Sequence, residues 1–266
     1  MLLTIETGNT NTHLGVFAGT GAHASLVRDW RLHTEPERTA DELALLIRGL
    51  LGSDVEQVTG VAALSTVPSL LRETRVMVGR YFDNPHNVIL EPGVRTGVPL
   101  LVDNPKEVGA DRVANCLAAH HKFGGPTIVV ACGTATVVDA VSARGEFLGG
   151  AIAPGVDLGV EALSEHTVTV RKVELMPPRS VLGKNTMEAL QSGILFGFAA
   201  QIDGLVERIR TTVPGFDGDV TVVATGYLAP LMFDECRTLS THHTHLTLEG
   251  LRLVHERSKA ATTRRK

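Results

Sequence analysis

The sequence predicts an α/β protein built from two similar halves. An apolar strand, a small polar turn and a second strand occur at residues 2–18 and again at 127–152, with Gly8 and Gly133 aligned at an offset of 125 residues. Apolar strand-like segments and amphipathic helix-like segments alternate along each half. The composition, 43% hydrophobic but 4% aromatic with 27 glycines, favours aliphatic strands and helices joined by tight turns.

Composition also excludes several classes of protein. A net charge of −4 argues against a nucleic-acid binder that depends on overall charge. The three cysteines are far apart and form no CxxC pair, so we expect neither a disulfide framework nor a zinc site. We find no basic leader, and no apolar run approaches the roughly 20 residues that span a bilayer. We therefore expect a cytoplasmic protein without a membrane partner.

The first half shows clear signals for its elements. Strands are expected at 2–7 and 13–18, around the polar turn. Residues 37–52 form a predicted helix, since Thr39 and Glu42 have capping-box spacing ahead of an apolar stripe. A buried strand is expected at 58–68, and helices near 68–82 and at 109–125.

The second half repeats the pattern. We expect two strands around the turn within 127–152, a long helix at 183–209 with Asn185 as its cap, a strand at 219–230 and a last helix at about 246–257. The halves are placed at residues 1–118 and 119–257. The tail, 258–266, is expected to be disordered.

The two turns have a chemical interpretation. Glycine lets backbone N–H groups approach an anion, and Thr and Asn side chains add donors. Two such turns facing each other would cradle a polyphosphate. Ordinary hairpin turns are also rich in Gly, Asn and Thr. The recurrence in both halves favours the phosphate cradle.

Six segments, "GNTNT", "DNPKEVGADR", "ACGTATVVD", "GEFLGGAIAPG", "PRSVLGKNT" and "ATG", occur in the order found in type III pantothenate kinases. The resemblance covers residues 1 to about 257. It implies membership of the acetate and sugar kinase/Hsc70/actin superfamily, with duplicated actin-like (ribonuclease H-like) halves and an ATP cleft between them. It also implies phosphorylation of pantothenate to 4'-phosphopantothenate, the first step of coenzyme A biosynthesis, by a homodimer using ATP with Mg²⁺ and a monovalent cation (K⁺ or NH₄⁺).

The resemblance also assigns residues by position. Asp111 matches the catalytic base, and Thr186 matches a substrate contact supplied by the partner subunit. The remaining matches are to pantothenate (Gly109, Ala110, Asp111 and Arg112) and to ATP (Glu6, Thr7, Gly8, Asn9, Thr10, Asn11, Thr12, His13 and Thr134).

Asp111 suits a phosphoryl transfer to an alcohol. A positioned carboxylate accepts the hydroxyl proton late in a loose transition state. Placement in the first turn of a helix favours the ionised form of that carboxylate. Taken alone, Asp111 would be a helix cap and Arg112 a surface charge; the family context favours the catalytic role.

Two acidic positions depart from the family pattern. Glu6 stands where the pattern has Asp, and Ala131 stands where it has the Asp assigned to the monovalent cation. Glu6 keeps the charge but displaces it by about 1.5 Å; Ala131 removes both oxygens. Asp139 lies too far along the next strand to substitute.

The preferred interpretation is a working pantothenate kinase with altered cation dependence. The alternatives are an impaired or silent homologue that binds nucleotide, and a kinase of the same fold acting on another small alcohol.

Overall fold

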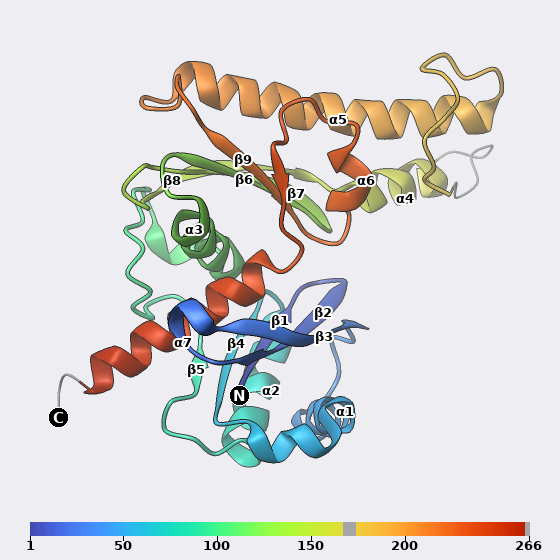
Figure 1. Cartoon of the computed structure of the whole chain (residues 1–266). Coiled ribbons are helices and arrows are strands. Elements are labelled where there is room, and N and C mark those ends of the chain that lie inside the picture. The colour runs from blue at the N-terminus through green and yellow to red at the C-terminus, as the bar shows by residue number, and fades with distance from the viewer. Residues whose placement is uncertain (167–173, 264–266) are drawn as a thin grey trace. The chain divides into compact units, whose positions relative to one another are not determined.

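The computed structural model describes residues 1–166 and 174–263, and the chain in it divides into two compact units (Figure 1). The first unit comprises Met1–Pro99, Asp103–Ala118 and Leu246–Lys266, and the second comprises Leu100–Val102 and Ala119–His245. We expected the second half to run from 119 to 257. Instead, the last helix, α7 (Leu246–Thr263), belongs to the first unit.

The expected disordered tail is also corrected. Helix α7 continues through Thr263, so most of the segment 258–266 is helical. Residues 264–266 lie outside the described part of the chain. The apolar pattern that predicts a helix ends near residue 257. The helix nevertheless continues to Thr263, because its first turns are packed in the first unit and each further residue then adds to an existing helix.

The first unit contains a five-stranded sheet in the order β3-β2-β1-β4-β5. Strand β1 pairs antiparallel with β2, which pairs antiparallel with β3, while β4 runs parallel to β1 and β5 parallel to β4. The bounds are β1 (Leu2–Thr7), β2 (Asn11–Ala18), β3 (Ser25–His33), β4 (Gly60–Ser65) and β5 (Val88–Ile89).

The second unit repeats this pairing scheme, with the order β10-β9-β6-β7-β8. Strand β6 takes the place of β1, and β7, β8, β9 and β10 take those of β2, β3, β4 and β5. The bounds are β6 (Thr127–Cys132), β7 (Ala135–Val141), β8 (Phe147–Pro154), β9 (Thr221–Thr225) and β10 (Thr241–His242). The fold is therefore α/β with duplicated halves, as the sequence predicted.

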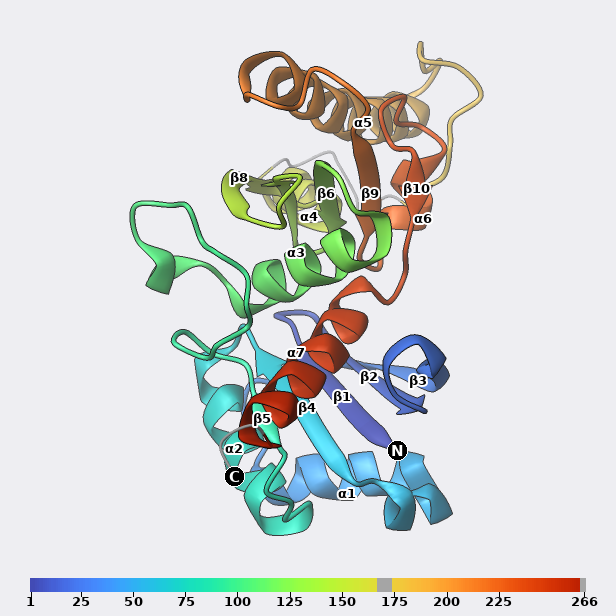
Figure 2. The same ribbon diagram turned by 60° about the vertical axis from the view of Figure 1, so that its left-hand side comes forward.

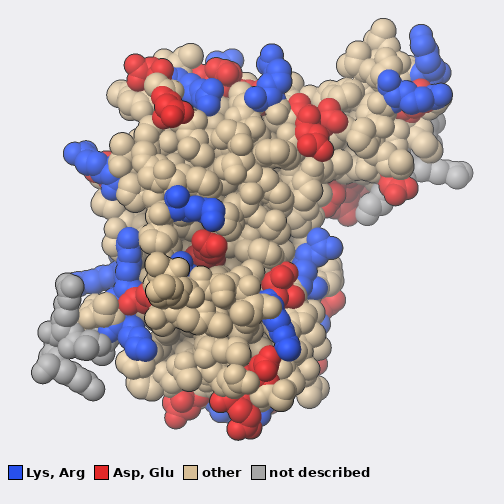
Figure 3. Space-filling view, in the orientation of Figure 1, with Lys and Arg blue, Asp and Glu red and all other residues tan. Residues whose placement is uncertain are grey.

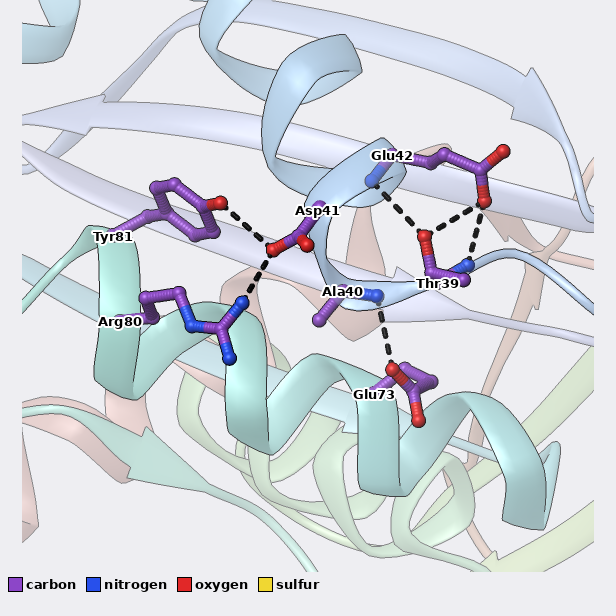
Figure 4. A network of polar contacts seen from close by, with 7 residues as sticks. All are labelled: Thr39, Ala40, Asp41, Glu42, Glu73, Arg80 and Tyr81. Atoms are coloured by element: carbon purple, nitrogen blue, oxygen red, sulfur yellow. Dashed lines mark hydrogen bonds and ion pairs between the residues drawn. The ribbon is translucent and has the colours of Figure 1, made fainter.

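Helix α1 (Ala40–Leu51) begins where its capping signal predicts. The Thr39 N–H donates to the Glu42 carboxylate at 2.8 Å, and the Glu42 N–H donates to the Thr39 hydroxyl (Figure 4). Helix α2 (Pro68–Tyr81) packs beside α1; Tyr81 donates its hydroxyl proton to Asp41 at 2.7 Å. These bonds satisfy donors at the start of α1, which a helix otherwise leaves unpaired.

The sheet of the first unit is covered on both faces. Side chains alternate along β1, so Leu3 and Ile5 pack into the core formed with α1 and α2, while Thr4 and Glu6 point to the other face. Figure 2 shows α7 lying across β1 and β4 on that other face. A Cβ on Gly15 of β2 would lie 3.0 Å from the Leu248 side chain, which confirms how closely α7 approaches.

In the second unit, Ile128 and Val130 of β6 occupy the positions of Leu3 and Ile5 and pack against the helices. The helices with buried residues in this core are α4 (Val156–His166), α5 (Thr186–Thr212) and α6 (Ala229–Phe233). Helix α3 (Ala110–Phe123) crosses from one unit to the other after Ala118. Short 3₁₀ helices cover Gly21–His23, Gly52–Gln57 and Pro105–Glu107.

Helix α5 corrects one expectation. No apolar segment long enough to span a bilayer was expected from the sequence, but α5 is long and apolar enough to cross a membrane by length and composition only. A core helix of a soluble protein passes the same test, and Leu195 and Ile202 of α5 are buried in the second core. Acidic and basic side chains are interspersed over the face that Figure 3 shows.

Candidate functional site

The first polar turn joins β1 to β2 between the paired residues Thr7 and Thr12. Both threonines are buried, and the Thr12 hydroxyl lies 2.9 Å from the Thr34 hydroxyl. Between them the Gly8 N–H donates to the Asn11 carbonyl at 2.9 Å, and the residues of the turn are partly or fully exposed. The flanking threonines therefore hold the hairpin, while Gly8 to Asn11 between them keep exposed surface at the tip of the turn.

Glu6 stands at the end of β1, directly opposite His13 of β2. Its carboxyl points away from the α1–α2 core, toward the face that α7 covers. Burial, and then the negative charge of Asp111, raise the pKa of Glu6 to about 7, while a hydrogen bond with the Thr247 side chain acts in the opposite direction. Glu6 is therefore poised to change charge near neutral pH.

Asp111 lies in the first turn of α3, and its carboxylate folds back over Gly109. A Cβ at position 109 would lie only 2.5 Å from the Asp111 Oδ1 atom. We expected the helix start to favour the ionised form. Hydrogen bonds from backbone N–H groups of Arg112 and of Asp111 itself do so, as does the Arg112 charge, but burial outweighs them and raises the pKa of Asp111.

Glu6 and Asp111 thus form a carboxyl pair, contributed by β1 and α3 of the first unit. Their environments differ, because Asp111 accepts backbone hydrogen bonds beside Arg112. Burial raises the pKa of both carboxyls, and the negative charge of Asp111 raises that of Glu6 further, so the two groups titrate as a coupled pair.

Two further residues connect to this pair. The Thr247 hydroxyl of α7 lies 2.9 Å from Asn115 Oδ1 of α3. Both side chains are buried, and Asn115 is one helical turn beyond Asp111. Neither residue was predicted from the sequence, which offered no signal that these distant positions meet.

In the second unit, glycines bring three chain segments together at the end of β6. The Gly155 N–H donates to the Thr134 carbonyl at 3.0 Å, and a Cβ on Gly155 would lie 2.2 Å from the Gly133 carbonyl oxygen. Gly226, after β9, has φ +92°, and a Cβ there would lie 2.4 Å from the Cys132 carbonyl oxygen. Gly133, Gly155 and Gly226 form what we call the cluster of glycine turns. Gly155 and Gly226 require glycine for this close backbone approach, whereas a Cβ on Gly133 would make ordinary contacts at 3.8 Å.

Comparison with known proteins decides the family. The type III pantothenate kinase family matches residues 2–208. A type III pantothenate kinase from Rhodococcus opacus is 61% identical, over 98% of this chain and 96% of its own length. Another, from Nocardia farcinica, is 62% identical over 97% of this chain and 98% of its own. The chain belongs to the type III pantothenate kinase family.

Solved structures support the same fold. The activator of the 2-hydroxyisocaproyl-CoA dehydratase from Clostridium difficile, solved with bound ADPNP, has a TM-score of 0.57 at 12% identity and covers 99% of this chain and 97% of its own. The Lmo2764 protein from Listeria monocytogenes has a TM-score of 0.54 at 11% identity, covering 97% and 99%. At these identities the likeness concerns the fold alone, which is the actin-like fold of the superfamily.

Ala131 lies in β6, at the position where the family resemblance led us to expect a cation-binding Asp. Its neighbour Cys132 is buried, and burial raises the pKa of that thiol to about 12, so Cys132 supplies no thiolate. Asp139 pairs with Val129, two residues farther from the turn than Ala131 and its partner. That separation is about 7 Å along the strands. Asp139 therefore does not occupy the missing position.

The other predicted residues of the family motifs lie in the second unit. Thr134 belongs to the second turn. Thr186 is the first residue of α5 and is exposed, directly after the N-cap Asn185, whose side chain accepts the Glu188 N–H at 2.9 Å. The structure brings Glu6 and Asp111 together in the first unit. Thr134 and Thr186 both belong to the second unit.

Sequence reasoning missed several residues near these turns. Gly155 and Gly226 lay inside two of the quoted family segments, so the signal was present but was not assigned to single residues. Tyr227 follows Gly226, and its hydroxyl donates to Asp157 of α4 at 2.9 Å. No pattern in the sequence indicated that contact.

Proposed function

We propose that this chain transfers the γ-phosphoryl group of ATP to the hydroxyl of pantothenate, forming 4'-phosphopantothenate and ADP as the first step of coenzyme A biosynthesis. Its membership of the type III pantothenate kinase family supports the substrate and the reaction. The observation that carries the proposal is the meeting of Glu6 and Asp111 beside the glycine-containing hairpin turn.

Asp111 acts as the base in this proposal. The substrate hydroxyl attacks the γ-phosphorus, the bond from phosphorus to the bridging oxygen of ADP breaks, and the hydroxyl proton passes to Asp111. Burial raises the pKa of Asp111, which makes its carboxylate a better proton acceptor. Gly109, Ala110 and Arg112 then line the pantothenate side of the carboxylate.

The phosphates of ATP are assigned to the two turns. In the first turn we propose contacts from the backbone and side chains of Gly8 to Asn11, since Thr7 and Thr12 are buried. Thr134 is assigned to the second turn, within the cluster of glycine turns. Exposed N–H groups in such turns favour anionic ligands.

We assign no binding site made of protein side chains to Mg²⁺ or to the monovalent cation. Within residues 1–166 and 174–263, no three His, Cys, Asp or Glu side chains are grouped to hold a metal ion. Mg²⁺ keeps several waters and binds through substrate phosphates, so we propose that it arrives with ATP. The residue at the family's position for a monovalent cation, Ala131, has no side-chain oxygen and does not fit that ion. No step is assigned to K⁺ or NH₄⁺.

A homodimer is proposed as the working form. Helices α4 and α5 form a groove of about 360 Å³ lined by Leu163, Leu190, Ile194 and Phe198 with small residues between them. Leu158 and Met187 on the same helices are 41% and 60% exposed. An apolar surface of this kind on a long helix suits a second copy of the chain. Thr186, at the start of α5, would reach the partner's substrate, and the dimer would be cytoplasmic.

An ADP-release assay with ATP and pantothenate tests the proposal. Turnover by the wild type that is lost in Asp111→Ala supports it. A silent wild type, with turnover appearing in Glu6→Asp/Ala131→Asp, would support the impaired homologue instead. If both remain silent with pantothenate while another small alcohol is phosphorylated, the substrate assignment is wrong.

A further inference from the structure

Thr247 connects Glu6 of the carboxyl pair to Asn115 of helix α3. It is on α7 and contacts the Glu6 carboxyl of β1, and its hydroxyl is 2.9 Å from Asn115 Oδ1. About one helical turn beyond Thr247, the backbones of α7 and α3 are in close contact: a Cβ on Gly250 would lie 2.1 Å from the Ala114 carbonyl oxygen. The position of Thr247 is therefore fixed by close packing of α7 on α3.

The hydroxyl of Thr247 has one proton to donate but two partners. With Glu6 protonated, Glu6 can donate to the Thr247 oxygen while Thr247 donates to Asn115 Oδ1. With Glu6 ionised, Thr247 must turn its proton to the carboxylate. Asn115 then satisfies the Thr247 oxygen only by presenting its amide nitrogen. The direction of this chain therefore follows the charge on Glu6.

We propose that Thr247 and Asn115 are positioning residues, which hold the Glu6 carboxyl beside Asp111 through a chain of hydrogen bonds from Asn115 to Thr247 to Glu6. The inference deepens the proposed kinase function and rests on it. Neither residue touches the reacting atoms; they act through Glu6. Their anchor is the α3–α7 contact, so the orientation of Glu6 is set by the same helix that carries Asp111.

Other ionisable groups lie around Glu6 on the neighbouring elements. Asp111 approaches from α3 with Arg112 beside it, and His13 lies directly opposite on β2. When Asp111 is ionised and Glu6 holds its proton, the pair carries one negative charge. Ionisation of Glu6 adds a second negative charge where the phosphates of ATP are expected, which opposes their binding. Fixing Glu6 therefore affects turnover as well as geometry.

Thr247→Val tests the proposal, since it removes the hydroxyl and keeps the shape, while Thr247→Ser keeps the hydroxyl. The Glu6 carboxyl is followed by ¹³C NMR in protein labelled at glutamate side chains, with Glu6→Gln identifying its signal. Losing a bond that favours the ionised form should move the Glu6 titration upward by about 0.5–1 pH unit in Thr247→Val. Thr247→Ser should restore it, and Thr74→Val, a buried threonine of α2 in the same unit, should leave it unchanged.

Kinetics supply the second measurement. We expect Thr247→Val to lower kcat about tenfold, the effect of one lost hydrogen bond, with the KM for pantothenate changed less than about twofold. An unchanged titration and kcat in Thr247→Val would overturn the inference, as would a Thr247→Ser variant that folds but behaves like Thr247→Val. The NMR titration needs no turnover. A catalytically silent wild type would refute the proposed function, and the titration would still decide whether Thr247 holds the Glu6 carboxyl.

Discussion

Replacing Glu6 by glutamine should make the stability of the first unit less dependent on pH. The pKa of Glu6 is raised from an ordinary value of 4.5 to about 7. The folded state therefore holds a proton that the unfolded chain releases between pH 4.5 and 7. Across that window the unfolded state binds fewer protons, so the free energy of unfolding of the wild type falls as pH rises. Above pH 7 this loss is complete.

The magnitude follows from the same values. A shift from 4.5 to about 7 corresponds to at most about 3 kcal/mol, at 1.36 kcal/mol per unit. Glu6→Gln cannot ionise and escapes this loss. The free energy of unfolding of Glu6→Gln relative to wild type should therefore rise by up to about 3 kcal/mol between pH 5 and pH 8.

Denaturant unfolding followed by Trp30 fluorescence measures this effect. Trp30 is the one tryptophan of the sequence and packs against the core of the first unit, so its signal reports on the unit that contains Glu6. Glu42→Gln is a control whose difference from wild type should stay constant between pH 5 and pH 8. Hydrogen bonds to the backbone and side chain of Thr39 lower the pKa of Glu42 below its ordinary value of 4.5, so Glu42 is ionised in both the folded and the unfolded state across that window. Equal differences between Glu6→Gln and wild type at pH 5 and pH 8 would refute the reasoning.

Three further predictions concern the two turns and the base. Asp111→Asn should lower kcat by about 10²–10⁴-fold while ATP binding, measured by calorimetry, is retained, because a positioned base contributes that much; loss of ATP binding as well would contradict this. Wild-type ADP release should be insensitive to K⁺, and Ala131→Asp should gain a K⁺ response; K⁺ activation of the wild type would count against the Ala131 argument. Gly226→Ala should lower the Tm and destabilise the fold by more than about 1 kcal/mol, because its φ is +92° and a Cβ would meet the Cys132 carbonyl oxygen; an unchanged Tm would disagree.

Local signals predicted much of the fold. The helix cap at Thr39 and the cap at Asn185 both form as expected, since capping depends on residues three positions apart. Strand β3 was missed because it lacks a continuous apolar run, and α4 because it follows directly after Gly155. Helix α6 was missed because its first residues were assigned to the strand expected at 219–230. The return of α7 to the first unit depends on long-range packing, such as Gly250 against Ala114, which no local pattern encodes.

The site was predicted less completely. Glu6 and Asp111 were both named from their motifs, but their contact joins β1 to α3 across more than a hundred residues and was not foreseen. The rise in the pKa of Asp111 caused by burial was also missed. A position at the start of a helix predicts the effect of the helix dipole on the carboxylate, but it does not predict how far the side chain is removed from water. Thr247 and Asn115 carry ordinary side chains in apolar helices. Their significance comes only from where the folded chain places them.

The return of the last helix has a consequence for synthesis on the ribosome. Residues Ala119–His245 form the bulk of the second unit and are complete before Leu246 onwards is made. The second unit can therefore fold as the chain emerges, while the sheet of the first unit, made earliest, waits with the face that carries Thr4 and Glu6 uncovered. A chain that stops before Leu246 would leave that face exposed and would lack Thr247, so premature termination should yield an aggregation-prone product that has a folded second unit and no fixed Glu6.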